Sequence, residues 1–487
     1  MVQKSLKKNA ILNFLRSFMN IAFPIISFPY ASRILLPDGI GKVNFANSVI
    51  EYFVLIAGLG VGMYAAREAS KIRDNASALN KLTREILAIN IVSTLLAYIL
   101  FAIALFALPK FSDYRILLIV CATKVLFSSI SMEWLYQAEE EYGYITLRSA
   151  FFQLVSLVML FVCVKTHDDY IWYALIGVVS NVGANICNLL YARRFVNVFE
   201  RTSLEIKKHL RPIFTFFGVA CASKIHSAMD TVMLGFMADD MAVGYYSAAS
   251  KIRRLVVELI TYVLGTLMPR SSYYIETKQF DEYNNILKKA AGIVFFFSVP
   301  ATAGLIVLAQ PIIVLFSGSE YLSAIPIMRV MAPIVIVYSV TSFLNHVVLT
   351  PYRKERYVLY AQVIGCVLNI GLNIPLITLW GAFGAGLSTL FVESAITLFL
   401  VISAIPNIKD ALAHLGIFLL KTVIGSVIMF LAVHFVISLS SIAFVQLLCG
   451  VLSGVLVYAI VELLLKNETA WWLWHIIVKM IKKGLSV

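Results

Sequence analysis

The stretch that decides the fold runs from Val243 to Pro269 and reads VGYYSAASKIRRLVVELITYVLGTLMP. It is long enough and apolar enough to cross a bilayer as a helix. Near its middle, however, it carries four charged side chains: Lys251, Arg253, Arg254 and Glu258. One charge at mid-membrane costs roughly 3 kcal/mol on insertion scales. We therefore expect these side chains to face water, one another or a ligand.

The composition of the whole chain is that of a membrane protein. The chain has 487 residues, of which 60% are hydrophobic and 14% are charged, and its mean hydropathy is +0.86. The apolar residues form blocks of about 20 or more, the length that a bilayer-spanning helix needs. We predict an all-α polytopic membrane protein whose first span follows a short basic N-terminus directly, without a cleaved signal peptide.

Charge and cysteine content argue against other classes of protein. The net charge of +13 would suggest nucleic-acid binding in a soluble chain, but positive charge in a membrane protein collects in cytoplasmic loops. No Walker motif is present, so ATP is not expected to be the direct energy source. No CxxC pair or histidine cluster occurs, and we predict buried free thiols rather than disulfides or a metal site. The six cysteines all lie in apolar blocks: Cys121, Cys163, Cys187, Cys221, Cys366 and Cys449.

The apolar blocks predict fourteen membrane-spanning helices. Pro24, Pro29 and Pro375 predict kinks in the first and eleventh of them. The glycine-rich stretch 381–386 predicts small-residue packing at a tight turn, because no strand precedes it. The aromatic and lysine-rich tail 471–483 predicts a helix lying on the inner membrane surface. The predicted spans are 11–36, 43–66, 85–108, 114–137, 144–164, 170–192, 212–237, 243–268, 290–316, 323–350, 357–379, 383–405, 414–437 and 442–465.

The loops between these spans predict that both termini are cytoplasmic. With the N-terminus inside, the outer loops hold only three positive residues, Lys42, Lys110 and Lys165, and the other loop lysines and arginines fall inside. This asymmetry follows the positive-inside rule. Each outer loop is about five residues long. A membrane enzyme such as a polysaccharide polymerase or ligase would need a larger outer loop for its catalytic groups, so we predict that the chain is not an enzyme.

A weak internal repeat relates the two halves of the chain. The segments that begin at Gly41 and Gly244 match in register, small residue for small and large for large, at a spacing of 203 residues. Repeated halves with a site near their interface are a known transporter plan. We predict an N-terminal lobe of spans 1–6, a cytoplasmic linker, a C-terminal lobe of spans 7–12, two appended spans and a cytoplasmic interfacial tail. Their bounds are 1–192, 193–211, 212–405, 406–465 and 466–487.

The repeat also places charges of the two halves at matching depth. Glu51 of span 2 corresponds to Arg254 of span 8, which has the opposite charge. We predict that this pair makes or breaks a contact between the lobes, in the wall of a polar cavity. Lys251, Arg254 and Glu258 share one helix face, whereas Arg253 points elsewhere. An ion pair between Arg254 and Glu258 within the helix is the alternative and would leave Lys251 free.

Further charged residues inside predicted spans extend the candidate site. Lys124 lies in the middle of span 4 and either faces the cavity or has a structural role. Arg16, near the cytoplasmic end of span 1, either extends to the membrane interface or binds a lipid phosphate. Lys224, His226 and Asp230 lie on span 7. A satisfied ion pair between His226 and Asp230 is the simpler interpretation, and coupling of transport to protons is the alternative.

Several segments together resemble one family. In the first half they are EWLYQAE at 133–139 and YITLR at 144–148. In the second half they are DTVMLG at 230–235, NIGLN at 369–373, and GAFGAG at 381–386 followed by Glu393. In order and spacing they resemble bacterial polysaccharide repeat-unit flippases, the Wzx-type members of the multidrug/oligosaccharidyl-lipid/polysaccharide exporter superfamily. The resemblance covers nearly the whole chain.

This resemblance implies a fold, a function and partners. It implies two six-helix lobes plus two C-terminal helices in the bacterial cytoplasmic membrane, and a cationic central cavity. It implies that undecaprenyl-pyrophosphate-linked oligosaccharide moves from the inner to the outer leaflet by alternating access, for surface polysaccharides such as O-antigen. No cofactor is expected, and coupling to H⁺ or Na⁺ is left open. We expect a monomer, with a polysaccharide polymerase and chain-length proteins as candidate partners and no nucleic acid.

The charged residues fit that expectation, because a pyrophosphate needs cationic partners. Two rivals in the same superfamily remain open. A lipid II flippase also has fourteen spans, whereas a cation-coupled multidrug exporter usually has twelve spans and a less cationic cavity. The substrate-binding candidates are Arg16, Lys124, Lys224, Lys251 and Arg254, and the gating or ion-coupling candidates are Glu51, His226, Asp230 and Glu258.

Overall fold

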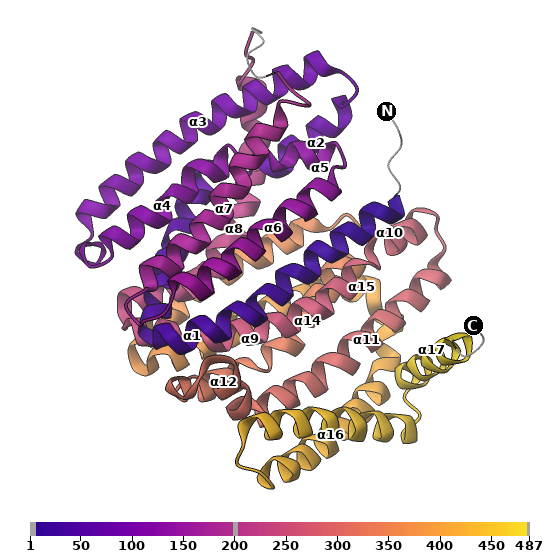
Figure 1. Cartoon of the computed structure of the whole chain (residues 1–487). Coiled ribbons are helices and arrows are strands. Elements are labelled where there is room, and N and C mark those ends of the chain that lie inside the picture. The colour runs from indigo at the N-terminus through magenta and orange to yellow at the C-terminus, as the bar shows by residue number, and fades with distance from the viewer. Residues whose placement is uncertain (1–5, 198–202, 485–487) are drawn as a thin grey trace. The chain divides into compact units, whose positions relative to one another are not determined.

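The computed structural model describes residues 6–197 and 203–484, and every regular element in these residues is a helix (Figure 1). The all-α fold class is confirmed. Contacts within the chain divide it into two units, residues 1–244 and 245–487. The sequence predicts a boundary in the linker 193–211, whereas this division falls after the helix that follows the linker.

The first unit is built mainly from long helices that lie next to α1. Among them, α3, α4, α6 and α8 all pack on α1, and α7 packs on α4 and α6 (Figure 1). The elements are α1 (Leu6–Gly58), α2 (Val61–Ile72), α3 (Ala76–Ala107), η1 (Pro109–Ser112), α4 (Arg115–Ser129), α5 (Glu133–Ala138), α6 (Tyr142–Cys163), α7 (Tyr170–Ala192) and α8 (Lys207–Met237).

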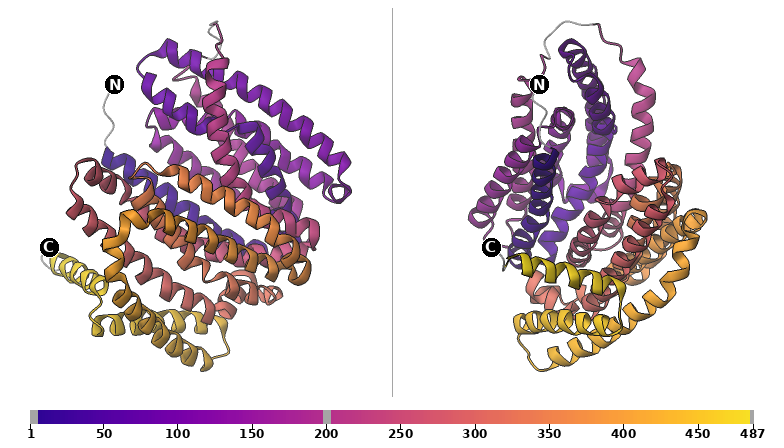
Figure 2. Two further views of the ribbon diagram at one scale, coloured as in Figure 1. Left: turned by 180° about the vertical axis from the view of Figure 1, so that it is seen from behind. Right: turned by 90° about the vertical axis from the view of Figure 1, so that its right-hand side faces the viewer.

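In the second unit α15 is the organising element, and α11, α13, α14 and α16 pack on it. The last two helices, α16 and α17, contact each other and α11 (Figure 2, yellow). The elements are α9 (Asp240–Gly265), α10 (Met268–Glu276), α11 (Phe280–Val307), α12 (Ala309–Ser317), η2 (Ser319–Tyr321), α13 (Ala324–Met331), α14 (Ile334–Phe343), a π-helical turn η3 (Leu344–Leu349), α15 (Glu355–Ser438), α16 (Ala443–Leu464) and α17 (Glu468–Gly484).

The predicted spans coincide mainly with these helices. In the described residues, ten helical segments are long and apolar enough to cross a membrane. Two of them, Ala22–Ile72 and Glu355–Pro406, each cover two predicted spans. The chain is therefore a multi-pass membrane protein, and the count of fourteen stays a prediction. The predicted tail helix is present as α17, and its position at the membrane surface likewise stays a prediction.

The two longest helices each contain a break in helical geometry. In α1 the break is at Leu36 (φ 58°, ψ 176°), the residue before Pro37. A proline disfavours helical backbone in the residue before it, which holds for Pro24 and Pro29 as well. What sets Pro37 apart is that its carbonyl meets Gly244 of α9. In α15 the break is at Gly381 (φ 53°, ψ −130°) rather than at Pro375. Glycine adopts this positive φ without a steric penalty.

Two glycines bring the start of α9 onto α1 within the first unit. A Cβ atom on Gly41 would collide with the carbonyl of Asp240, and one on Gly244 would collide with the carbonyl of Pro37. Gly41 and Gly244 correspond in the predicted repeat of 203 residues, and so do Pro37 and Asp240. Only glycine lets two backbones approach so closely. The same contact is thus made twice, once by each copy, which supports the internal repeat.

The motif at 133–139 serves the core of the first unit. Trp134, Leu135 and Tyr136 of α5 are buried in an apolar cluster with residues of α2, α3 and α6. Arg148 of α6 pairs with Glu133 at 3.3 Å and donates a hydrogen bond to the side chain of Asn188 in α7. Large apolar side chains and a buried charged hydrogen bond both stabilise packing. This motif therefore holds α5, α6 and α7 together and lies outside the candidate site.

Candidate functional site

An ion pair between α1 and α8 is the clearest polar feature inside the predicted spans of the first unit. The Lys224 ammonium lies 2.6 Å from a carboxylate oxygen of Glu51, and each side chain keeps about 40% of its surface exposed, 40% and 41% respectively. Close approach of α1 and α8 makes the pair possible. Gly235 of α8 lies against the ring of Phe45, where a Cβ atom would collide. Exposed charges of this kind remain available to a ligand.

A second lysine reaches the same stretch of α1 from α4. The Lys124 ammonium donates a hydrogen bond to the side-chain oxygen of Asn47 at 2.6 Å. Asn47 and Glu51 are four residues apart, so they lie on one face of the helix. The structure therefore brings Lys124 and Lys224 to one face of α1, from two different helices. The sequence predicted each lysine as a cavity residue but gave no signal for Asn47, the residue that groups them.

The other predicted residues of the first unit are placed as follows. Asp230 is buried on α8, with 5% of its surface exposed. The side chains of Arg16 and His226 lie outside the described part of the structure. The ion pair that the sequence suggested between His226 and Asp230, and the roles of all three residues, therefore remain predictions.

The charged stretch of the second unit lies on α9. Lys251 and Glu258 are half-buried and Arg254 is exposed. Lys251 and Arg254 stand one turn apart and Glu258 follows Arg254 by four residues, so all three share a face. Like charges at this spacing repel, and Glu258 partly compensates for them. The structure thus presents the predicted group of charges on one face of one helix.

Arg253 belongs to a different set of contacts in the second unit. It interacts electrostatically with Glu393 of α15 and with Tyr338 of α14. Its Nε atom is buried without a hydrogen-bond partner among the described residues. Sequence reasoning did not connect these residues. The available signal was that Arg253 and Glu393 are both charged within apolar blocks.

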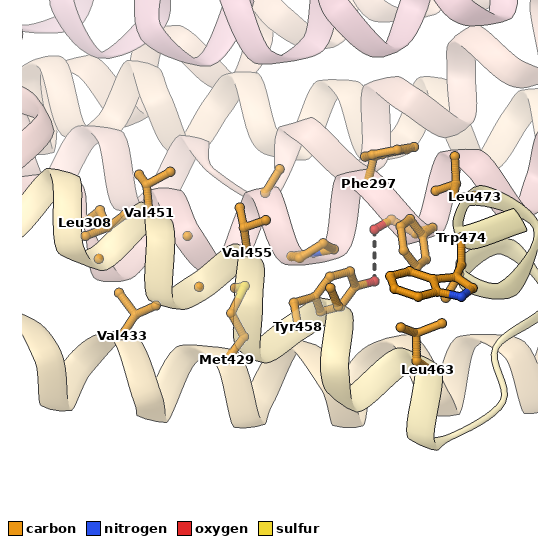
Figure 3. A pocket seen from close by; sticks show the side chains of 18 residues that line it. Phe297, Leu308, Met429, Val433, Val451, Val455, Tyr458, Leu463, Leu473 and Trp474 are labelled. Carbon is orange, nitrogen blue, oxygen red and sulfur yellow. Dashed lines mark hydrogen bonds between the residues drawn. The ribbon is translucent and has the colours of Figure 1, made fainter. Parts of the chain in front are cut away.

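An apolar cavity of about 430 Å³ lies in the second unit between α11, α15, α16 and α17. Figure 3 shows Met429 and Val433 of α15 opposite Val455 of α16, with Trp474 of α17 beside Tyr458. The Tyr458 hydroxyl donates a hydrogen bond to the carbonyl of Phe296 at 2.9 Å, so the one phenol in the wall is satisfied. Three glycines help to leave the space open: Gly304, Gly450 and Gly454.

The described residues offer no obvious metal centre. None of them forms a group of three or more His, Cys, Asp or Glu side chains that could hold an ion. All six cysteines are unpaired. The prediction of buried thiols is confirmed only for Cys121, because Cys449 is exposed and the other four are partly exposed. The groups described above are ionic and apolar: lysines and arginines for an anion, carboxylates as their partners, and a hydrophobic cavity.

Comparison with known proteins gives a consistent picture. The family model described as "Polysaccharide biosynthesis protein" matches residues 6–275, and the model MatE matches residues 217–375. A protein of Shigella dysenteriae named "Putative O-antigen transporter" is 25% identical over 400 residues, which are 81% of this chain and 99% of that protein. A "Lipid II flippase MurJ" of Bacillus subtilis is 25% identical over 256 residues, 51% of this chain and 44% of that protein.

Solved structures share the fold. A lipid II flippase MurJ in an inward closed conformation has a TM-score of 0.68 at 18% identity, covering 93% of this chain and 97% of its own. An inward-facing multidrug transporter of the MATE family has a TM-score of 0.62 at 12% identity, covering 85% of this chain and 97% of its own. These relatives are transporters and flippases rather than enzymes, which agrees with the prediction made from the short outer loops.

Proposed function

Because the chain belongs to the polysaccharide biosynthesis protein family, we propose that it is a flippase for undecaprenyl-pyrophosphate-linked oligosaccharide. It moves repeat units from the inner to the outer leaflet by alternating access through a cationic cavity, for assembly of a surface polysaccharide. It acts as a monomer in the bacterial cytoplasmic membrane with both termini inside, and it delivers repeat units to a polysaccharide polymerase and its chain-length proteins. The family match over more than half of the chain and the transporter relatives support this class.

One observation carries the proposal at the level of residues. Lys124 and Lys224 converge on a single face of α1 at Asn47 and Glu51. A pyrophosphate is recognised by such cations, since charge-assisted hydrogen bonds to phosphate oxygens are strong. In the empty protein Glu51 neutralises Lys224. Substrate phosphate then competes with the Glu51 carboxylate for the ammonium group, and Glu51 takes the lysine back after release.

The charges on α9 serve the same ligand in the second unit. Lys251 and Arg254 supply further cations on one helix face, and Glu258 limits their repulsion while the site is empty. Arg16 is a further phosphate-binding candidate. Asp230 and His226 are the candidates for coupling to H⁺ or Na⁺, because buried ionisable groups in transporter helices commonly mark ion pathways. Glu51 and Arg254 remain the candidates for a contact that changes during the cycle.

The apolar cavity fits the other end of such a substrate. Its lining side chains are apolar apart from the satisfied Tyr458 hydroxyl and the Trp474 indole N–H, so a hydrocarbon chain can enter with little desolvation of polar groups. We assign it to a part of the isoprenoid tail. Such a cavity would distinguish a lipid-linked substrate from a small drug.

A genetic experiment tests the proposal. Cells that lack the chromosomal gene are complemented with the wild-type protein, with Lys124→Ala plus Lys224→Ala, or with the control Lys165→Ala in an exposed outer loop. The control should restore surface polysaccharide. The double variant should reach the membrane but export about tenfold less, and lipid-linked repeat units should accumulate. Normal export by the double variant would contradict the assignment of the site.

The lipid II flippase and the multidrug exporter make different predictions in the same cells. Loss of a lipid II flippase would stop cell-wall synthesis, and loss of an exporter would raise drug sensitivity. Deletion should instead abolish a surface polysaccharide without either effect.

A further inference from the structure

A buried carboxylate in α3 organises the start of α8. Glu85 has 1% of its surface exposed. One of its oxygens lies 2.7 Å from Nε2 of His209 and 3.2 Å from the Lys208 ammonium. The other accepts the backbone N–H of Glu205 at 2.8 Å. Several donors from one short segment thus compensate for the burial of this charge, which would otherwise be costly.

His209 links this carboxylate to a third helix. Its ring is buried, with 3% exposed, and Nδ1 lies 2.6 Å from the hydroxyl of Tyr64 in α2. A neutral ring with its proton on Nε2 satisfies both contacts. It donates to Glu85 and accepts the Tyr64 hydroxyl proton. One side chain of α8 is therefore hydrogen-bonded to α2 and α3 at the same time.

The linker before α8 is held by α3 on both sides of the segment 198–202. Before that segment, the backbone N–H of Asn197 donates to the Asn80 side chain at 2.8 Å. After it, Glu205 pairs with Lys81 at 2.9 Å and with Lys208 at 3.0 Å. These two hydrogen-bonded ammonium groups lower the pKa of Glu205 to about 2. The carboxylate therefore remains charged at every physiological pH.

Close packing continues about two turns further along α8. A Cβ atom on Gly60, which has a positive φ of 68°, would lie 2.8 Å from the backbone of Phe216 and Phe217. The guanidinium of Arg67 in α2 lies over the Phe216 ring at 5.2 Å from its centroid. Backbone contact, a cation–π contact and the buried hydrogen bonds thus all fasten the same part of α8.

We propose that Tyr64, Glu85 and His209 form a permanent clasp that keeps the first turns of α8 attached to α2 and α3 throughout the transport cycle. This inference rests on the proposed transport function. The clasp stays closed because opening it would leave a buried carboxylate without its donors. Conformational change is then taken up beyond Phe217 and not in the described parts of the linker, 193–197 and 203–206. The clasp therefore determines that the part of α8 that moves begins after Phe217.

Cross-linking across the clasp tests this directly. All six cysteines are replaced by alanine, and Arg67→Cys and Phe216→Cys are introduced. Reconstituted protein is bridged with a short reducible bis-methanethiosulfonate reagent. Transport of undecaprenyl-pyrophosphate-linked glycan should stay within about twofold of the unbridged protein. Loss of about tenfold that is reversed by reductant would overturn the proposal. Arg73→Cys with Glu140→Cys controls for the reagent. These residues form an exposed ion pair at 3.0 Å between the residue that follows α2 and the segment after α5.

Two further experiments distinguish failure of the clasp proposal from failure of the proposed transport function. A second pair, Lys81→Cys and Glu205→Cys, gives the same test if the first pair does not fold. If the cysteine-free parent moves no glycan, that result counts against the proposed function and not against the clasp. The clasp is then judged by dipolar broadening between spin labels at positions 67 and 216, without a gradient, with a proton gradient and with a sodium gradient. Unchanged broadening supports the clasp, and broadening that is lost under either gradient overturns it.

Discussion

The proposed anion site on α1 depends on a few individual side chains. Glu51, Lys124 and Lys224 could each be found in the sequence, because a charge inside an apolar span is expensive and rarely kept without use. Which of these side chains pair with each other could not be predicted from the sequence. Whether Glu51 meets Lys224 or another cation depends on the rotation and depth of two helices, which are set by packing such as that of Gly235 on Phe45. The predicted contact of Glu51 with Arg254 stays a prediction.

The Glu51–Lys224 pair should matter for transport far more than for stability. Both side chains are about two-fifths exposed, and exposed ion pairs contribute about 0–1 kcal/mol. Glu51→Gln and Lys224→Gln should therefore each shift the thermal midpoint in detergent by at most about 2–4 °C, while export falls about tenfold. A pair with a purely structural role would show parallel losses of both.

Arg148 should show the opposite pattern. It is buried, with 8% exposed, and bonds both Glu133 and Asn188. Arg148→Met would remove the charged donor that bonds both Glu133 and Asn188 and should cost about 1–3 kcal/mol, measured as loss of folded protein in a thermal stability assay. Arg194→Met is the matched control, because Arg194 is exposed. Equal stability of the two variants would contradict the structural role of the motif.

The long helices of the chain are interrupted by breaks in helical geometry. The existence of long apolar helices could be predicted from composition and length. The positions of the breaks were less visible, because Pro24, Pro29 and Pro37 all lie within α1. Geometry selects among them: helical backbone is lost at Leu36, directly before Pro37, where a neighbouring helix meets α1 through Gly244. A sequence read without its tertiary contacts does not show that distinction.

The break in α1 predicts a stabilising substitution. Leu36 has φ 58° and ψ 176°, a conformation that is nearly restricted to glycine and costs other residues about 1–3 kcal/mol. Leu36→Gly should relieve that strain, and after the higher chain entropy of glycine is subtracted a gain of about 1 kcal/mol remains. Leu35→Gly, at a fully helical and buried position, should be destabilising. Thermal unfolding of both variants tests the assignment, and destabilisation by Leu36→Gly would refute it.

The whole molecule shows what the internal repeat could and could not predict. The match of Gly41 with Gly244 is weak in sequence, yet both glycines make the equivalent backbone contact in the structure. The division of the chain into two units is harder to predict from the sequence. The linker 193–211 stays the predicted boundary between the lobes, while contacts within the chain group α8 with the first unit. Contacts such as that of Glu85 with His209 join residues more than 120 positions apart. The apolar cavity left no sequence signal, since it depends on how four helices fail to fill a space.

Filling that cavity should separate folding from transport of a lipid. Ala301 lines it, and Ala301→Trp would occupy much of the volume proposed for the isoprenoid tail. Export should fall about tenfold while the protein still reaches the membrane in normal amount. Leu456→Trp is the control, because Leu456 is 61% exposed on α16 and does not line the cavity. Full export by Ala301→Trp would contradict the assignment of the cavity to the isoprenoid tail.

Direct translocation of the proposed substrate is the measurement that tests the central claim. Purified protein is reconstituted into vesicles whose inner leaflet carries radiolabelled undecaprenyl-pyrophosphate-linked repeat units from the source cells, and the fraction exposed to an impermeant oxidant is followed. Exposure should be at least about tenfold faster than in protein-free vesicles, slower with lipid II as substrate, and reduced by Lys124→Ala plus Lys224→Ala. Exposure no faster than in protein-free vesicles, or transport of lipid II alone, would contradict the account.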